Sequence, residues 1–187
     1  MPFLIAAFLS GAIGLIRGGR FGNLARLTFR WSALVLLALG LQIFVIYGPG
    51  KLDSRPYSFS ALLILCSYGL LMVAVVANWQ IPGMILLGLG AALNFLVILV
   101  NGGWMPVTAD HLALSGLVSP TTLAPGQRVL YSKDLIVDSQ ETRLRWLSDV
   151  FVIPRAGLLS VVFSTGDVLM MLGLFWLIQF GMMDETG

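Results

Sequence analysis

The segment that decides the fold is GLLSVVFSTGDVLMMLGLFWLIQFGMM, residues 157–183, whose single charged residue is Asp167. As one helix it would be about 40 Å long and would place this carboxylate deep in a bilayer core of roughly 30 Å. However, Ser164-Thr165-Gly166-Asp167 matches a helix N-terminus with Ser164 as the N-cap and Asp167 at the third helical position. A helix over 165–182 then has the length of a membrane span, and Asp167 faces the positive end of its dipole. We favour this second interpretation, which makes Asp167 a cap instead of a charge on an ion pathway.

The composition is typical of a membrane protein. Of the 187 residues, 58% are hydrophobic and only 11% are charged, whereas about one quarter of an ordinary soluble domain is charged. Further apolar runs lie upstream at about 2–16, 31–47, 57–77 and 82–100. Together with 165–182, these runs predict an all-α integral membrane protein, a single membrane domain built as a bundle of about five transmembrane helices.

The longest polar stretch, about 101–154, is predicted to be one long extracytoplasmic loop. Within it, 127–137 alternates weakly and could form a short hairpin strand. Pro154 and Gly157 interrupt the segment 146–163, which we interpret as interfacial or re-entrant.

A cluster of basic residues sets the predicted orientation. Arg17, Arg20, Arg26 and Arg30 lie between the first two apolar runs with no acidic residue among them. Such loops favour the cytoplasmic side. With five spans, the N-terminus and the 101–154 loop then lie outside and the C-terminus inside. Alternatively, these arginines contact anionic lipid or phosphate.

A second set of polar residues is predicted to meet near the outer helix ends. The set comprises Asp149, Arg155, Ser164, Asp167, Asn94, Asn101 and Gln42. As a functional site they would line an outward-facing polar pocket, with the two aspartates as acid/base or cation-binding groups and Arg155 as an anion partner. As structural residues they would cap helix ends and hydrogen-bond between helices. We favour the structural interpretation, because caps alone explain several of the positions.

Several function classes are excluded or disfavoured by what the sequence contains. It has no Gly-rich phosphate loop, zinc motif or nucleophile elbow. The single cysteine, Cys66, allows no intramolecular disulfide, and the single histidine, His111, argues against a multi-histidine metal or haem site. The net charge of +2 comes from scattered arginines, so we expect no nucleic-acid partner. We expect no cofactor and no metal.

Three short motifs carry a resemblance to a known family. They are Asn-Gly-Gly-x-Met-Pro at Asn101 to Pro106, Leu147-Ser148-Asp149 followed by Pro154, and Ser-x-Gly-Asp at Ser164 to Asp167. The chain resembles, from the arginine-rich loop to the last helix, a bacterial integral membrane family known as domain of unknown function 5317. The resemblance implies a multi-pass protein of the bacterial plasma membrane, and it implies no activity.

Three functional hypotheses follow. The first is an accessory or scaffolding subunit of a larger membrane complex, without catalysis of its own, whose partners are membrane lipids and other membrane proteins. The second is a small transporter or a lipid- or ion-binding protein that uses the outward-facing pocket. The third is a membrane enzyme that uses Asp149 and Asp167. The scarcity of ionisable groups favours the first.

Overall fold

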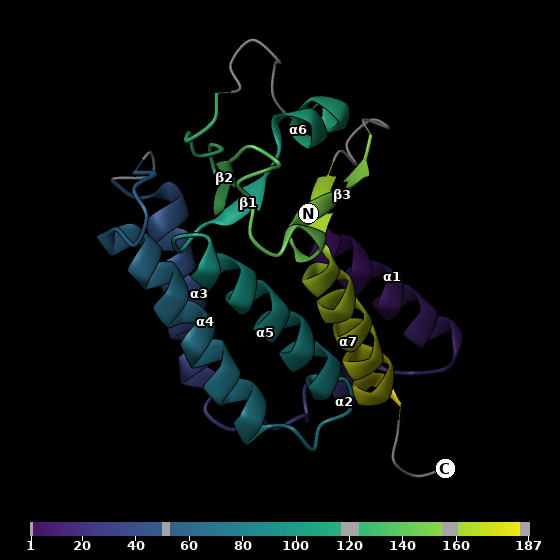
Figure 1. The fold of residues 1–187 in the computed structure, drawn as a ribbon. Coiled ribbons are helices and arrows are strands. Elements are labelled where there is room, and N and C mark those ends of the chain that lie inside the picture. Colours follow the sequence, from purple (N-terminus) through teal and green to yellow (C-terminus); the bar gives the residue numbers. More distant parts are fainter. Residues whose placement is uncertain (1, 50–52, 117–123, 155–160, 184–187) are drawn as a thin grey trace.

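The computed structural model describes residues 2–49, 53–116, 124–154 and 161–183, and it has a layer of helices beneath a small sheet (Figure 1). The long helices are α1 (Pro2–Ile16), α3 (Ser32–Tyr47), α4 (Phe59–Ala77), α5 (Met84–Val100) and α7 (Thr165–Met182). Two short helices, α2 (Phe21–Leu24) and α6 (Ala109–Ser115), join them. The long helices begin and end within two residues of the predicted apolar runs.

The stretch expected to be a loop contains a sheet. Its strands are β1 (Met105–Val107), β2 (Asp134–Ile136), β3 (Asp149–Ile153) and β4 (Val161–Ser164), in the spatial order β2-β1-β3-β4. The central strand β1 pairs in parallel with β2 and β3, and β3 pairs antiparallel with β4. The prediction of an all-α bundle is therefore wrong, because the fold mixes helices with a four-stranded sheet.

The expected number of membrane-spanning helices is also too high. Within the described ranges, α4 and α7 are long and apolar enough to cross a membrane by length and composition, whereas α1, α3 and α5 are shorter. Local backbone geometry shortens the helices: α5 begins only after Gly83, which has a φ of 90°, and α3 ends at Gly48 in extended conformation. Two such helices are a weak indication of membrane association.

The segment 146–163, predicted to be interfacial or re-entrant, forms β-structure in its described part. It begins with the end of a short 3₁₀ turn, η2 (Arg145–Leu147), and continues into the hairpin of β3 and β4. The strands are rich in valine, isoleucine and phenylalanine, which fit a pleated surface. They pair from Asp149 opposite Ser164 to Ile153 opposite Val161. Ser164 ends β4 and begins α7, so the hairpin fixes where the last helix starts.

Close packing of small residues joins α5 to α7. A side chain added at Gly90 would meet the carbonyl oxygen of Gly166 and would approach the Met170 amide nitrogen to 2.8 Å. Further along, Gly83 and Gly173 allow the same close approach. Helices in apolar surroundings pack closely through such small residues, and this pairing places the first turn of α7 beside the middle of α5.

Polar contacts tie the arginine-rich segment to the far end of α7. The Arg17 guanidinium donates to Gln179 Oε1 (2.8 Å), and the Gln179 amide donates to the Ser10 carbonyl (2.6 Å). The Arg20 amide donates to the Met182 carbonyl (2.8 Å). The arginines therefore lie at the end of the helical layer opposite the sheet, while the N-terminus lies at the sheet end (Figure 1).

Candidate functional site

The predicted helix cap at the start of α7 is confirmed. Ser164 Oγ accepts a hydrogen bond from the Asp167 amide (3.0 Å), and Asp167 Oδ2 accepts one from the Ser164 amide (3.0 Å). These reciprocal bonds form a capping box. The Ser164 hydroxyl also donates to Asn94 Oδ1 (2.8 Å), and Asn94 Nδ2 donates to Asp167 Oδ1 (2.9 Å). The three buried side chains form one closed network between α5 and α7.

Two strand residues bring further charges to this network. Asp134 pairs with Met105 on one side of β1, and Asp149 pairs with Val107 on the other side. Asp149 also lies opposite Ser164 in the β3–β4 hairpin. The sheet register therefore delivers two more carboxyl groups to the junction between the sheet and the first turn of α7.

The two strand carboxyl groups interact electrostatically. Burial, and secondarily the neighbouring Asp134 carboxylate, raises the pKa of Asp149 well above its ordinary value. Burial also raises the pKa of Asp134. Two adjacent carboxyl groups resist carrying two negative charges, so loss of the second proton from this pair is disfavoured. Asp149 is only 3% exposed, and its Oδ1 atom is buried without a hydrogen-bond partner.

Two basic side chains compensate these acids: Arg128, whose guanidinium interacts with Asp134, and Lys133. Lys133 Nζ donates to the Tyr68 hydroxyl (3.0 Å) and lies 5.7 Å from the centre of the Tyr68 ring. Burial by itself would lower the pKa of Lys133, but Tyr68 and the carboxylates of Asp167, Asp149 and Asp134 raise it well above its ordinary value. The lysine is therefore charged at neutral pH. Its ammonium group contacts the Tyr68 hydroxyl of α4 and interacts electrostatically with the three carboxylates.

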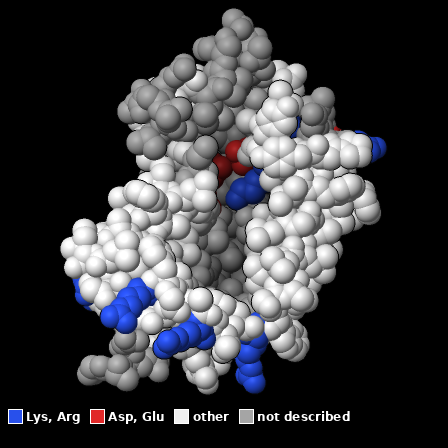
Figure 2. Space-filling model, turned by 180° about the vertical axis from the view of Figure 1, so that it is seen from behind, with Lys and Arg blue, Asp and Glu red and all other residues white. Residues whose placement is uncertain are grey.

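An apolar cavity lies among the helices and extends from the level of Leu71, Ala91 and Met170 toward Phe29 and Asn78 at the arginine-rich end. Its volume is about 430 Å³, and its walls come from α3, α4, α5 and α7. Leu71, Ala91 and Met170 line it, each three residues from a cluster residue on the same helix and displaced from the sheet by about 4.5 Å of helical rise. Figure 2 shows acidic and basic side chains together in a hollow near the middle of one face, with further basic side chains at its lower end. The charged groups of the site thus lie where the sheet meets the helices, and the apolar cavity lies within the helical layer.

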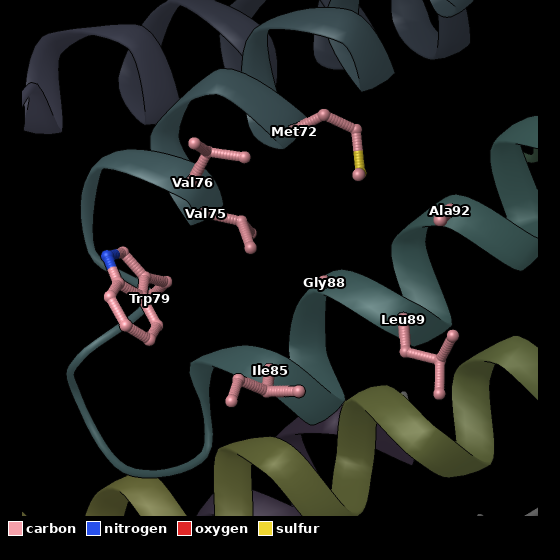
Figure 3. Close-up of a pocket in the computed structure, with 8 residues that line it drawn as sticks. All are labelled: Met72, Val75, Val76, Trp79, Ile85, Gly88, Leu89 and Ala92. Atoms are coloured by element: carbon pink, nitrogen blue, oxygen red, sulfur yellow. The ribbon is translucent and has the colours of Figure 1, made fainter.

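A second hollow is wholly apolar at its walls. It is a groove between the end of α4 and α5, lined by Met72, Val75, Val76, Trp79, Ile85, Gly88, Leu89 and Ala92 (Figure 3). Since it contains no group that could carry chemistry, we take the charged cluster as the candidate functional site.

The remaining residues predicted for the pocket lie elsewhere. The Gln42 amide donates to Ser67 Oγ (3.0 Å) between α3 and α4. Asn101 holds the backbone of Arg143 through two hydrogen bonds of 2.9 and 3.0 Å. Arg155 lies outside the described residues. Asn94, Ser164, Asp167 and Asp149 are the predicted residues that the fold brings together.

Comparison with known proteins identifies the family. A model described as a family of unknown function (DUF5317) matches residues 26–179. The chain belongs to this family. Within 173 aligned residues it is 30% identical to an uncharacterized protein of Thermotoga maritima, covering 92% of this chain and 85% of the relative. No solved structure matches the chain. The resemblance drawn from the short motifs is confirmed, and membership of the DUF5317 family supplies no activity.

Sequence reasoning missed three members of the cluster. Lys133 and Asp134 lie in the stretch 127–137, which was predicted as a possible short hairpin strand and does form a hairpin, with an antiparallel bridge between Arg128 and Leu135. That prediction assigned these two residues no role in a site, and Tyr68 lies within an apolar helix. An adjacent lysine and aspartate at the start of a short apolar strand was the available signal. Within the described part of the chain, no group of three or more His, Cys, Asp or Glu residues could hold a metal ion.

Proposed function

We propose that the protein binds an amphiphile in a membrane, with a hydrogen-bond-donating head group in the carboxyl cluster and an apolar chain in the cavity among the helices. The observation that carries this proposal is the buried Asp149 Oδ1 atom, which has no hydrogen-bond partner among the described residues. An apolar cavity of about 430 Å³ lies in the helical layer that carries Tyr68, Asn94 and Asp167 of the same cluster. A buried acceptor without a partner costs about 1–3 kcal/mol. A ligand that supplies the missing donor recovers this energy.

The charge balance of the cluster selects the head group. Three carboxyl groups, those of Asp134, Asp149 and Asp167, face the ammonium group of Lys133, and the Arg128 guanidinium adds a second positive charge near Asp134. The acids still outnumber the bases. The lysine is already engaged by Tyr68 and the acids, so an anionic head group would meet uncompensated negative charge. An amine or several hydroxyl groups would instead donate to free carboxyl oxygens. We therefore expect an amine-bearing lipid or a glycolipid.

The proposed location is the bacterial plasma membrane, with the helical layer embedded. Two helices, α4 and α7, have the length and composition of membrane spans. Side chains such as Leu36 and Ile85 point outward at 70% and 67% exposure, which suits contact with lipid. Basic side chains gather at the end opposite the sheet (Figure 2), and the charge rule favours that end, with the C-terminus, on the cytoplasmic side. The sheet then lies outside.

The two other hypotheses fare differently. A membrane enzyme that uses Asp149 with Asp167 is disfavoured, because the Asp167 carboxylate is already bonded to Ser164 and Asn94. The scaffolding hypothesis stays a prediction. The same purification tests it, because a scaffolding subunit extracted in mild detergent would co-purify with stoichiometric amounts of its protein partners.

The experiment measures lipid retention by native mass spectrometry. The purified protein is delipidated in mild detergent and titrated with phosphatidylethanolamine or with a glucosyl diacylglycerol. We expect saturable binding of at least one of them by the wild type. Asp149→Asn should weaken it at least fivefold, and Val35→Phe, which fills the cavity from α3, should do the same.

The matched control is Asp138→Asn, which removes an exposed carboxyl group from the same polar region. It should bind as the wild type does. Equal binding by wild type, Asp149→Asn and Val35→Phe would overturn the proposal, as would absence of binding for both lipids.

A further inference from the structure

The apolar groove between α4 and α5 has a basic mouth. A polar depression of about 480 Å³ adjoins it, and Arg30, Asn78 and Gln80 are among the residues that line this depression. Val76 and Trp79 line both the depression and the groove, so the two form one continuous surface. In Figure 3 the Trp79 indole stands at one end of the groove and Met72 at the other.

Asn78 holds the mouth of the groove in place. Its side chain accepts from the Arg30 amide (2.7 Å) and donates to the Arg30 carbonyl (2.8 Å). It also donates to the Ala74 carbonyl of its own helix (2.7 Å). This buried clamp fixes the Arg30 backbone beside the end of α4, while the Arg30 side chain is exposed. The Arg30 backbone is therefore held at the mouth, and its side chain extends from there.

The groove has the dimensions of a lipid chain site. Its α5 wall runs from Ile85 to Ala92, about 10 Å by helical rise. Val76 and Trp79 are 66% and 60% exposed, so the apolar surface is open along its length. Tryptophan is typical of the boundary between head groups and hydrocarbon, and here it stands between the apolar wall and the basic mouth.

We infer that this surface binds an anionic phospholipid, with its phosphate at Arg30 and one acyl chain in the α4–α5 groove. Charge complementarity argues for that occupant. The residues that line the groove and its mouth include no acid, and Arg17, Arg20 and Arg26 add positive charge at the same end of the molecule. A basic end attracts anionic lipid over neutral lipid. The inference rests on the membrane location proposed above, but not on the carboxyl cluster.

The test compares phosphatidylglycerol with phosphatidylcholine, again by native mass spectrometry of delipidated protein in mild detergent. We expect the wild type to bind phosphatidylglycerol preferentially at one saturable site. Arg30→Gln should weaken this binding about fivefold, the loss expected for one basic side chain near an anionic head group. Ala92→Trp, which fills the groove, should weaken it while leaving the arginine in place.

Two controls make the result specific. Arg26→Gln removes the same charge at the same end but outside the groove and its mouth, so it should weaken binding clearly less than Arg30→Gln does. Free inorganic phosphate at millimolar concentration should not displace the lipid if the groove holds the chain. Equal weakening by Arg26→Gln and Arg30→Gln, or full displacement by phosphate, would overturn the inference. Asp149→Asn should leave phosphatidylglycerol binding unchanged, which separates this site from the carboxyl cluster.

Discussion

Replacing Ser164 with alanine should destabilise the protein far more than the loss of an ordinary helix cap. The hydroxyl accepts from the Asp167 amide and donates to Asn94 Oδ1. Loss of an N-cap costs about 1 kcal/mol, and an unsatisfied buried acceptor costs a further 1–3 kcal/mol. Asn94 is fully buried, so water cannot replace the lost donor. We expect a total of about 2–4 kcal/mol.

The comparison variant is Ser58→Ala. Ser58 caps α4 by accepting from the Ala61 amide (3.3 Å), so its replacement should cost about 1 kcal/mol. The assay is thermal unfolding in one detergent at a fixed scan rate, followed by tryptophan fluorescence. For a chain of this size each kcal/mol shifts the midpoint by about 2–4 °C. If Ser164→Ala lowers the midpoint by no more than Ser58→Ala, the link to Asn94 contributes nothing and the reasoning fails.

Three further predictions concern charge and packing. The pKa of Asp149 is raised in the folded state, so the folded protein holds a proton that the unfolded chain releases near pH 3.8. The free energy of unfolding therefore falls as pH rises above that value. In a series of unfolding midpoints measured at different pH values, Asp149→Asn should make this fall smaller. Lys133→Met should cost about 2 kcal/mol at neutral pH, less than loss of a fully buried ion pair, because the lysine residue is only half-buried. The cost should fall as pH is lowered, because the pKa values of Asp149 and Asp134 are raised and their protonation removes the negative charges that Lys133 meets. Gly90→Ala should eliminate the peak of folded protein in size-exclusion chromatography, because the added methyl carbon meets the α7 backbone. At Gly69 the added carbon faces open space, so Gly69→Ala should raise the thermal unfolding midpoint slightly.

The helices were predictable because their signals are local. Pro82 and Gly83 precede α5, Gly48 follows α3, and the Ser164 capping box opens α7. The sheet was not predictable from the sequence, because β1 and β2 have only three residues each and the strands that pair with β1 lie far along the chain. Strands that short show no measurable alternation. Their pairing partners are set by tertiary packing, which hydropathy does not encode.

The site was predictable only where helix-end rules applied. Asn94 and the capping box were placed near one another from their positions along two helices, and the network of hydrogen bonds joins them. The parallel pairing of β2 with β1 brings Lys133 and Asp134 to the site. This pairing cannot be predicted from the local sequence. The most perturbed groups of the site therefore came from the segment about which the sequence said least.

The two carboxyl groups from the strands argue for a ligand more strongly than the capping box does. Every oxygen of the Asp167 carboxylate has a partner, so that residue is explained by the stability of α7. Asp149 retains a buried oxygen without a donor, which lowers stability and serves no element of the fold. A bound head group that donates to this atom stabilises the folded state in proportion to RT ln(1 + [L]/Kd). The stabilisation by such a lipid should therefore vanish in Asp149→Asn and persist in Asp138→Asn, because only the first removes the acceptor that the ligand completes.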